Sequence, residues 1–589
     1  MKFNKLILGG VLSTLLFSCN DLDMPPRNII QENDVFKSEA GITSYMATLY
    51  AEIPMEDHRY NMWGFNNFTN FPTSYNVSGE ALIVRGGDFL YTNPDGSWFQ
   101  AWQYSQIRNI NFFMESLEKN KDNFTADKYN AWMGEAHFMR AFQYFAMVKR
   151  YGGIPIIEKV QNFPEQSIEE LKVPRNTEQE VYDFIGAELD KAISMLPENA
   201  FAKGRANKNA AYALKSRAML YAGSIAQYGQ MQLNNILGIP AADAKKYYQA
   251  SYDASKALEG KYSLYNKYAD KYENFCKLFL DEDNSEVILG RYYKFPEYTH
   301  NLEMMNIPRQ LHGAEGYSSH CNPTLELCKL FDDVDGNYDW IKIGTENNPV
   351  RYEHRKDLFA KAQPRLRATV IFAGDEYKNE VIDVRKGIYE SYPNGELHTS
   401  GDFTAMYKDM TIIGQSGMED MQTTSTGLYI RKYGDPSIDI SNVVGWRGTV
   451  QWIEMRYAEI LLNRAEAAFA LGKVDDALNC VNQVRERGGA KLLTRGQMTA
   501  EKIQLERRME LAFESHTYWD LRRWRIASTE IDAKQYYALC PYYVYDEGKY
   551  IFKEEKVGPM YTFYPKVNYV MIPKDQIVKN DLLVQNPGY

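Results

Sequence analysis

One stretch of the sequence concentrates the residue types that enzymes use for acid–base chemistry. Residues 506–524 read ERRMELAFESHTYWDLRRW, and these nineteen residues include four carboxylates, four arginines, one histidine and two tryptophans. A histidine among carboxylates could transfer protons, and grouped arginines could hold an anion. The same residue types could instead brace a large helical fold, with the arginines bonded to carboxylates on adjacent helices.

The spacing within this stretch favours the structural role. Four residues would share one face of a single helix: Leu505, Met509, Ala512 and His516. A histidine on an apolar face is more often a core residue with a satisfied partner than a catalytic base. Arg507 and Glu510 are three residues apart and could pair along this helix. We therefore predict that residues 506–524 are an internal brace.

The rest of the sequence contains none of the motifs that mark common catalytic or nucleotide sites. G-x-S-x-G, H-E-x-x-H, the P-loop and G-x-G-x-x-G are all absent. DDVDGNYD (332–339) alternates carboxylates, but Gly336 does not hold the sixth position of an EF-hand loop, so we predict a solvated turn. His312 and His320 could form a metal pair, although dispersed histidines favour no metal. We predict no catalytic residue, metal or cofactor, and a structural calcium ion stays open.

Composition and charge place the chain among large globular proteins. It has 589 residues, 44% of them hydrophobic, a size at which two lobes or more are expected. The 44 tyrosines suggest surfaces that present flat apolar faces with polar edges. The net charge is −10 and no long basic run occurs, which argues against a nucleic-acid partner.

The N-terminal residues have the pattern of an exported lipoprotein. Two lysines precede the apolar run LILGGVLSTLLF, which is too short to span a bilayer, and Cys19 follows Ser18. Leu16–Cys19 resembles a bacterial lipobox, so we expect a signal peptide at 1–18, lipidation of Cys19 and a tether over 19–33. Cleavage by ordinary signal peptidase stays open. Lipid would be the only membrane attachment, because no other run of about 18 apolar residues occurs.

The other five cysteines are too few and too scattered for a disulfide scaffold or a zinc site, and no C-x-x-C occurs. Buried free thiols are the favoured interpretation, with a Cys321–Cys328 pair as the alternative.

Helical periodicity dominates two parts of the chain. Apolar residues recur at helical spacing over 99–119, 135–151, 177–196, 205–223, 243–258, 457–471 and 474–487. Gly152 and Gly472 are expected to end helices. Helix pairs of this length with small residues at their contacts are similar to tetratricopeptide units. We predict a helical scaffold over about 99–275 and 448–530. The segments 58–98 and 280–447 lack this periodicity and are expected to form an irregular lobe that carries the ligand site.

Several blocks of sequence together resemble one family. In chain order they are GEAHFMRAFQYFAMVKRYGGIPII, PRNTEQEVYDFIGAELDKAISMLP, GRANKNAAYALKSRAMLYAG, NPTLELCKLF, RYAEILLNRAEAAFALGK, ERRMELAFESHTYWDLRRW and IPKDQIVKNDLLVQNPGY. Their types and order are similar to those of the SusD/RagB family of outer-membrane nutrient-binding lipoproteins, over nearly the whole of residues 34–589.

The resemblance implies a fold and a function. The fold would be predominantly α, with about four tetratricopeptide-like helix pairs packed against an irregular, loop-rich lobe with short β segments. The protein would bind a glycan at the cell surface and deliver it to a SusC-like TonB-dependent outer-membrane transporter, without cleaving it. Two alternatives stay open: a peptide-binding relative, and a glycoside hydrolase with two unmarked carboxylates.

A glycan site needs aromatic faces for sugar C–H groups and polar groups for hydroxyls. The candidates from the irregular lobe are Trp63, Tyr75, Asn76, Arg85, Asp88, Trp98, Tyr293, Tyr298 and Tyr317. Trp102 is assigned to packing.

Overall fold

The computed structural model describes residues 35–55, 74–83 and 99–589, except positions 164, 283, 314–315, 419–421 and 446. The predicted signal peptide and Cys19 lie outside the described residues. In the described part, no helix is long and apolar enough to cross a membrane.

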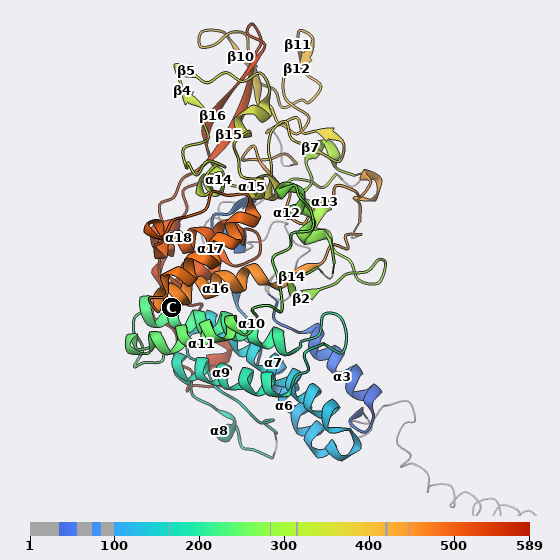
Figure 1. Ribbon diagram of the computed structural model, residues 1–589, viewed down its shortest axis with the longest axis vertical. Coiled ribbons are helices and arrows are strands. Elements are labelled where there is room, and N and C mark those ends of the chain that lie inside the picture. Colours follow the sequence, from blue (N-terminus) through green and yellow to red (C-terminus); the bar gives the residue numbers. More distant parts are fainter. Residues whose placement is uncertain are drawn as a thin grey trace, which may run out of the picture.

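Eight helices pack one against the next in a continuous row, which gives four helix pairs as predicted. In order they are α6 (Tyr104–Lys119), α7 (Ala126–Tyr151), α9 (Glu178–Met195), α10 (Lys208–Tyr228), α11 (Ala244–Lys256), α16 (Tyr457–Ala470), α17 (Val474–Gly488) and α18 (Ala500–Glu510). α11 and α16 are neighbours in space although residues 257–456, which include much of the irregular lobe, separate them in sequence (Figure 1).

Local sequence explains the ends of these helices. α9 begins with a capping box, in which Thr177 and Glu180 exchange side-chain and backbone hydrogen bonds. α7 ends at Tyr151 and is capped by Gly152, whose φ of 71° suits glycine and whose N–H donates to the Val148 carbonyl. Gly472, with φ 79°, turns the chain between α16 and α17. These stops were predicted and are confirmed.

Small residues let the helices approach closely. A Cβ at Gly223 of α10 would lie 2.9 Å from the ring of Tyr248 on α11, so only glycine permits this contact. On α9 the apolar residues Val181, Ile185 and Leu189, which stand at helical spacing in the predicted 177–196 helix, are all buried. α7 is buried around almost its whole circumference, because α6 and α9 pack on either side of it.

Shorter elements complete the chain. The other α-helices are α3 (Glu39–Ala51), α5 (Ser74–Val77), α8 (Ile168–Leu171), α12 (Lys271–Leu280), α13 (Leu302–Asn306), α14 (Leu325–Leu330), α15 (Pro364–Thr369), α19 (Thr517–Arg523), α20 (Ala527–Ile531) and α21 (Lys574–Lys579). The strands are β1 (Ala81–Ile83), β2 (Val287–Arg291), β3 (Cys321–Pro323), β4 (Gly344–Thr345), β5 (Asn348–Pro349), β6 (Val370–Ile371), β7 (Glu376–Tyr377), β8 (Glu380–Val381), β9 (Gly387–Tyr389), β10 (Leu397–His398), β11 (Met406–Tyr407), β12 (Met410–Thr411), β13 (Tyr429–Ile430), β14 (Trp452–Arg456), β15 (Tyr536–Val544) and β16 (Lys549–Val557).

The irregular lobe is built mainly from two-stranded pairings. β1 pairs with β3, and β2 pairs with β14 just before α16 begins. The largest sheet has the order β10-β9-β15-β16, in which β15 and β16 form a long antiparallel hairpin and β9 runs parallel to β15. This sheet lies at the end of the molecule remote from α6 and α9 (Figure 1).

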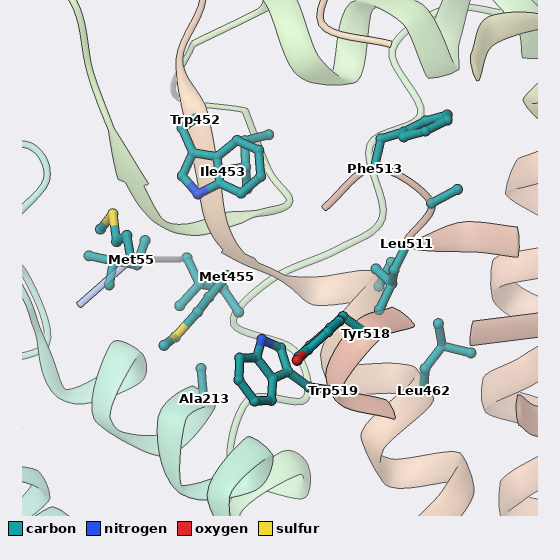
Figure 2. Close-up of a cluster of buried hydrophobic side chains, with 14 of the residues drawn as sticks. Met55, Ala213, Trp452, Ile453, Met455, Leu462, Leu511, Phe513, Tyr518 and Trp519 are labelled. Atoms are coloured by element: carbon teal, nitrogen blue, oxygen red, sulfur yellow. The ribbon is translucent and has the colours of Figure 1, made fainter. Parts of the chain in front are cut away.

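One hydrophobic core joins the helical row to the irregular lobe. Trp452 and Met455 of β14 are buried together with Trp519 of α19, above α10 (Figure 2). The Trp452 indole also stacks on the Tyr433 ring of the irregular lobe, with ring centroids 5.4 Å apart. The two expected lobes therefore share one packed interior.

Residues 506–524 do not form the single helix that their spacing predicted. α18 ends at Glu510, a turn follows, and α19 begins at Thr517. Phe513 and Ser515 both have φ of 60°, a left-handed conformation that ends the helix without a glycine or proline. The prediction that Leu505, Met509, Ala512 and His516 share one helical face was therefore wrong.

Candidate functional site

Most charged residues of the 506–524 stretch are buried, and several of them pair with residues from distant segments. Glu510 accepts from three arginines: Arg365 at 2.9 Å, Arg456 at 2.7 Å and Arg487. Burial alone would raise the pKa of Glu510, but the three guanidinium groups outweigh it and hold the pKa at about 2.

Neighbouring ion pairs extend this arrangement, which we call the buried ion-pair network. It has five carboxylates and five cations: Glu286, Asp332, Glu506, Glu510 and Glu514, with Arg365, Lys432, Arg456, Arg485 and Arg487. All ten side chains are buried. The equal numbers of the two charges make the network neutral overall.

The remaining polar residues of the stretch are also paired. Arg507 bonds to Asp520 at 2.7 Å and to the Asn463 amide oxygen, so the predicted Arg507–Glu510 pair does not form. Burial, followed by the nearby arginines, keeps the pKa of His516 well below its usual value. Its neutral Nδ1 can therefore accept from the Arg507 guanidinium, 3.3 Å away. The predicted structural role of this stretch is confirmed.

The segment DDVDGNYD is only partly the solvated turn that was predicted. Asp333 turns the chain by accepting the backbone N–H groups of Asp335 and Asn337, and Asp335 is exposed. Asp332 is instead buried and pairs with Arg485 at 2.6 Å. It was misassigned because its partner lies in α17, far along the sequence.

An exposed aromatic hairpin lies at the surface of the irregular lobe, directly after β2. Lys294 and Tyr298 exchange backbone hydrogen bonds of 2.7 and 2.8 Å, which closes a tight loop with Phe295 near its tip. Phe295 is 54% exposed and Tyr298 is 43% exposed. Because large aromatic side chains are usually buried, two exposed rings on one short hairpin mark a candidate binding surface.

Tyr293 supports this surface from below. Its ring is 6% exposed and stacks on the Tyr298 ring, with centroids 4.9 Å apart and planes 2° from parallel. The His300 ring packs edge-on against Tyr293 at 4.7 Å. Burial lowers the pKa of His300 to about 4, against the opposing hydrogen bond to the Val450 carbonyl. An uncharged imidazole therefore backs the aromatic stack.

A cavity of about 220 Å³ adjoins the hairpin. Its lining includes Phe295, Asn301, Glu303, Asn442 and Arg447. The Arg447 guanidinium lies 5.8 Å from the Phe295 ring centroid, and the Arg291 side chain donates to the Tyr298 hydroxyl. We call the hairpin and this cavity the aromatic site.

The only carboxylate in the lining of this cavity, among the described residues, is already bound to the protein. Glu303 pairs with Lys378 at 2.8 Å and accepts the Tyr377 hydroxyl at 2.9 Å. Lys378 also donates to the backbone carbonyls of Asp435 and Ile438, and Ile438 is itself a lining residue of the cavity. The Glu303 carboxylate is therefore engaged in holding the cavity wall together through Lys378 and Tyr377.

Of the predicted site residues, some lie at the aromatic hairpin or near β3, some are buried in α5, and the others lie outside the described residues. Tyr298 and Tyr293 form the exposed and the buried half of one stack, and Tyr317 is 39% exposed close to β3. Tyr75 and Asn76 are buried in α5, which differs from the exposed arc that was predicted: the Tyr75 hydroxyl donates to the Phe513 carbonyl and its ring packs on Phe513. Four predicted residues lie outside the described residues: Trp63, Arg85, Asp88 and Trp98.

Sequence reasoning did not select Phe295, Arg291, Asn301, Asn442 or Arg447 for this surface. Phe295 stands in the same run, RYYKFPEYTH, as the selected tyrosines, so aromatic density could have identified it. Arg447 and Asn442 reach the site through the pairing of His300 with Gly448, a contact between segments 148 residues apart that no local pattern reveals.

Metal-binding geometry is sparse. Within the described ranges, one group could supply three metal ligands: Glu390, Glu396 and His398. The five described cysteines are free thiols, four of them buried, as predicted. The absence of a metal or cofactor stays a prediction, and a structural calcium ion stays open.

Comparison with known proteins places this geometry in a family. The SusD family model matches residues 285–589, and a second model, described as starch-binding and associating with the outer membrane, matches residues 22–220. SusD-like protein P2 of Formosa agariphila is 23% identical over the full length of both chains. A SusD-like protein of Bacteroides ovatus is 21% identical, over 99% of this chain and 98% of its own.

Solved structures show the same fold. The structure of a SusD-like protein from Bacteroides fragilis superposes with a TM-score of 0.70 at 25% identity, and covers 96% of this chain and all of that one. A SusD-like carbohydrate binding protein from the same species has a TM-score of 0.67 at 20% identity, over 93% of this chain and all of its own. With one family model covering more than half of the sequence, the chain belongs to the SusD family.

Proposed function

We propose that this protein binds a glycan at the aromatic site and delivers it to a SusC-like, TonB-dependent outer-membrane transporter, while lipid on Cys19 attaches it to the cell surface. Family membership supports the proposal, as does the second family model, whose description names starch binding and the outer membrane. A relative of the same fold is described as carbohydrate binding.

The observation that carries the proposal is the Tyr298 ring, packed on Tyr293 and still 43% exposed. A pyranose ring has apolar C–H faces that stack on aromatic rings. A ring that is already held by a second ring loses little side-chain freedom when a sugar covers it, so less of the binding energy is spent on ordering.

Polar groups around the cavity supply the second requirement for sugar recognition. Sugar hydroxyls need donors and acceptors near the ring plane, and Arg291, Arg447 and Asn442 lie around the two aromatic side chains. Phe295 offers a second apolar face at the hairpin tip. Tyr317, exposed further along the same segment, is a candidate for an additional contact.

Binding without cleavage agrees with the chemistry of the cavity. Glycoside hydrolysis requires two carboxyl groups flanking the scissile bond. Glu303 is the one carboxylate among the described lining residues, and its charge is compensated by Lys378 at 2.8 Å. We therefore propose a binding protein rather than a hydrolase.

Affinity electrophoresis tests this function. Residues from Asn20 onward would be run through gels that each contain one plant, microbial or host polysaccharide, and retardation in a gel identifies the bound glycan. Tyr298→Ala and Phe295→Ala should each raise the Kd for the glycan by about five- to thirty-fold, which reduces the retardation. Each variant removes an apolar stacking face worth roughly 1–2 kcal/mol.

The matched control is Tyr338→Ala, since Tyr338 is 38% exposed and contacts Lys502 instead of the hairpin. It should leave the retardation unchanged. Equal effects of Tyr298→Ala and Tyr338→Ala would refute the aromatic site. Absence of retardation in every gel, with capture of peptides from a peptide library, would favour the peptide-binding alternative.

A further inference from the structure

A second and larger cavity lies far along the chain from the aromatic site, where the C-terminal residues fold back onto the helical row. Its volume is about 470 Å³, within the range of small-molecule sites. The lining comes from the end of α10 with the following loop, from the residue after α19 and its cap, and from the C-terminal tail. We call it the C-terminal cavity.

The walls of the C-terminal cavity are held by specific contacts. The Asn586 side chain is buried, accepts from Arg175 and donates to the carbonyls of Tyr151 and Val570. A Cβ at Gly588 would lie 3.1 Å from the Lys566 side chain, so a glycine lets the tail pack against that lysine. The C-terminus lies beside the helices of the row (Figure 1). The cavity is therefore part of the folded framework.

Two cations line this cavity, and neither has a carboxylate partner in the described part of the chain. The Arg525 guanidinium donates to the Arg522 carbonyl at 2.8 Å and to the Tyr569 hydroxyl at 2.7 Å. Lys566 donates to the Gly588 carbonyl at 3.2 Å. A guanidinium has five N–H donors, so Arg525 keeps capacity for a ligand.

The nearest buried acid lies behind Tyr569. Glu178 accepts the Tyr569 hydroxyl and the Gly238 N–H, each at 2.7 Å. Arg525, Tyr569 and Glu178 thus form a line in which the phenol separates the two charges. The line holds Arg525 in place and leaves its cation in the lining of the cavity, in a chain whose net charge is −10.

The rest of the lining suits a sugar. The side chains of Gln230, Gln232 and Asn568 can bond hydroxyl groups, and the Tyr228 ring with Pro565 and Pro587 offers apolar surface. A planar carboxylate matches the geometry of a guanidinium fork, and Lys566 adds a second positive charge. A small sugar that carries a carboxylate would match the polar, apolar and cationic parts of this lining.

We propose that the C-terminal cavity binds a carboxylated sugar, a hexuronate residue, as a second saccharide site. The proposal deepens the proposed glycan function and rests on it for its biological meaning. It selects acidic glycans among the possible substrates, because a neutral sugar would bring no negative charge to Arg525 and Lys566.

Calorimetry with small probes tests the cavity separately from the aromatic site. Galacturonate and glucuronate would be titrated into the wild-type protein, with the methyl ester of galacturonate as a neutral probe of nearly the same shape. We expect a uronate to bind at least about ten-fold more tightly than the ester, because the ester cannot pair with a guanidinium.

Variants locate the binding. Arg525→Gln and Lys566→Gln should each weaken uronate binding by about ten-fold, and Lys574→Gln, an exposed lysine outside the lining, should not. Lys566→Gln and Gln232→Ala alter half-buried or exposed side chains, so they stay informative if Arg525→Gln fails to fold. Tyr298→Ala should leave uronate binding intact, which separates this test from that of the aromatic site.

Three results would overturn the proposal: no uronate binding by the folded wild-type protein, equal binding of acid and ester, or equal effects of Lys566→Gln and Lys574→Gln. Full competition by acetate at the same concentration as the uronate would also overturn it, since the sugar would then contribute nothing. Loss of polysaccharide retardation with uronate binding retained would instead refute the proposed function and leave the cavity assignment standing.

Discussion

The buried ion-pair network and the aromatic site use residue types in opposite ways. In the network, Glu510 and its neighbours are the residues that a sequence reader would choose for catalysis, yet each is buried and bonded to several partners. In the aromatic site, Tyr298 and Phe295 are ordinary core residue types, yet they are 43% and 54% exposed.

The two regions differ in how much interaction capacity their side chains leave unused. A carboxylate that accepts from three arginines has nothing left for a substrate, and removing it would leave charges unpaired in the interior. The Tyr298 ring is stacked on Tyr293 and has the Arg291 guanidinium 5.0 Å from its centroid, yet the residue stays 43% exposed and so keeps surface for a ligand. The Arg525 and Lys566 cations lie between these cases, since the fold positions them but no described carboxylate forms an ion pair with either.

Glu510→Gln should produce the largest change in stability. The amide cannot neutralise Arg365, Arg456 and Arg487, so three buried cations would lose a shared partner. Breaking a buried pair on one side typically costs about 3–5 kcal/mol. Urea unfolding should show this loss, while the folded fraction should keep its polysaccharide retardation.

Glu118→Gln provides the comparison for this variant, because Glu118 is half exposed and bonds at the surface to Lys121 and Tyr129. It should leave the unfolding curve unchanged. If the Glu510→Gln protein were as stable as the Glu118→Gln protein, the buried ion-pair network would contribute no more to stability than a surface ion pair.

The second largest effect on stability is expected when the pH falls, because His300 is buried. Its pKa is 6.5 in the unfolded chain and about 4 in the folded protein, where burial disfavours the charged form. Between these pH values the unfolded chain binds a proton that the folded protein does not, so stability falls by up to about 3 kcal/mol as the pH drops from 6.5 to 4.

The measurement is unfolding free energy against pH for wild type and His300→Gln. The variant should lose part of the slope in this range, and His516, which also stays neutral, should account for part of what remains. Parallel profiles would show that His300 is not the titrating group.

Much of the fold could be predicted from local sequence. The helices of the scaffold follow from apolar periodicity, and their ends follow from Gly152 and Gly472. The turn after Glu510 could not be predicted, because Phe513 and Ser515 adopt left-handed backbone that nothing in their residue types requires. Tertiary pairing of Glu510 with arginines from three other segments favours this turn over a longer helix.

The sequence predicts the residue types of the candidate site better than it predicts which individual residues form it. Aromatic density pointed to both Tyr75 and Tyr298, and only packing distinguishes them: Tyr75 is covered by Phe513, from more than 400 residues away, whereas Tyr298 stays exposed. Arg447 joins the site because its neighbour Gly448 forms an isolated bridge with His300. Such contacts depend on the whole fold, so a single sequence does not display them.

Tyr293→Leu should weaken glycan binding by about five-fold, through loss of the ring that backs Tyr298. Tyr293→Phe keeps the ring and should bind like wild type, which separates stacking support from any role of the hydroxyl. Affinity electrophoresis on the identified polysaccharide measures both. If Leu and Phe variants bind equally, the buried half of the stack does not contribute to binding.

The smallest effect is expected at the edge of the site, with Arg447→Ala. Arg447 is exposed and lies 5.8 Å from the Phe295 ring centroid, a distance at which a surface cation–π contact contributes about 0.5–1 kcal/mol. A two- to five-fold loss of affinity corresponds to that range. Arg447→Lys keeps the charge but cannot donate from a planar fork, so it separates the two contributions: full recovery with lysine assigns the effect to charge, and no recovery assigns it to hydrogen bonding of sugar hydroxyls. A thirty-fold loss would place Arg447 among the main contacts, and exposure alone would then no longer rank the residues of the aromatic site.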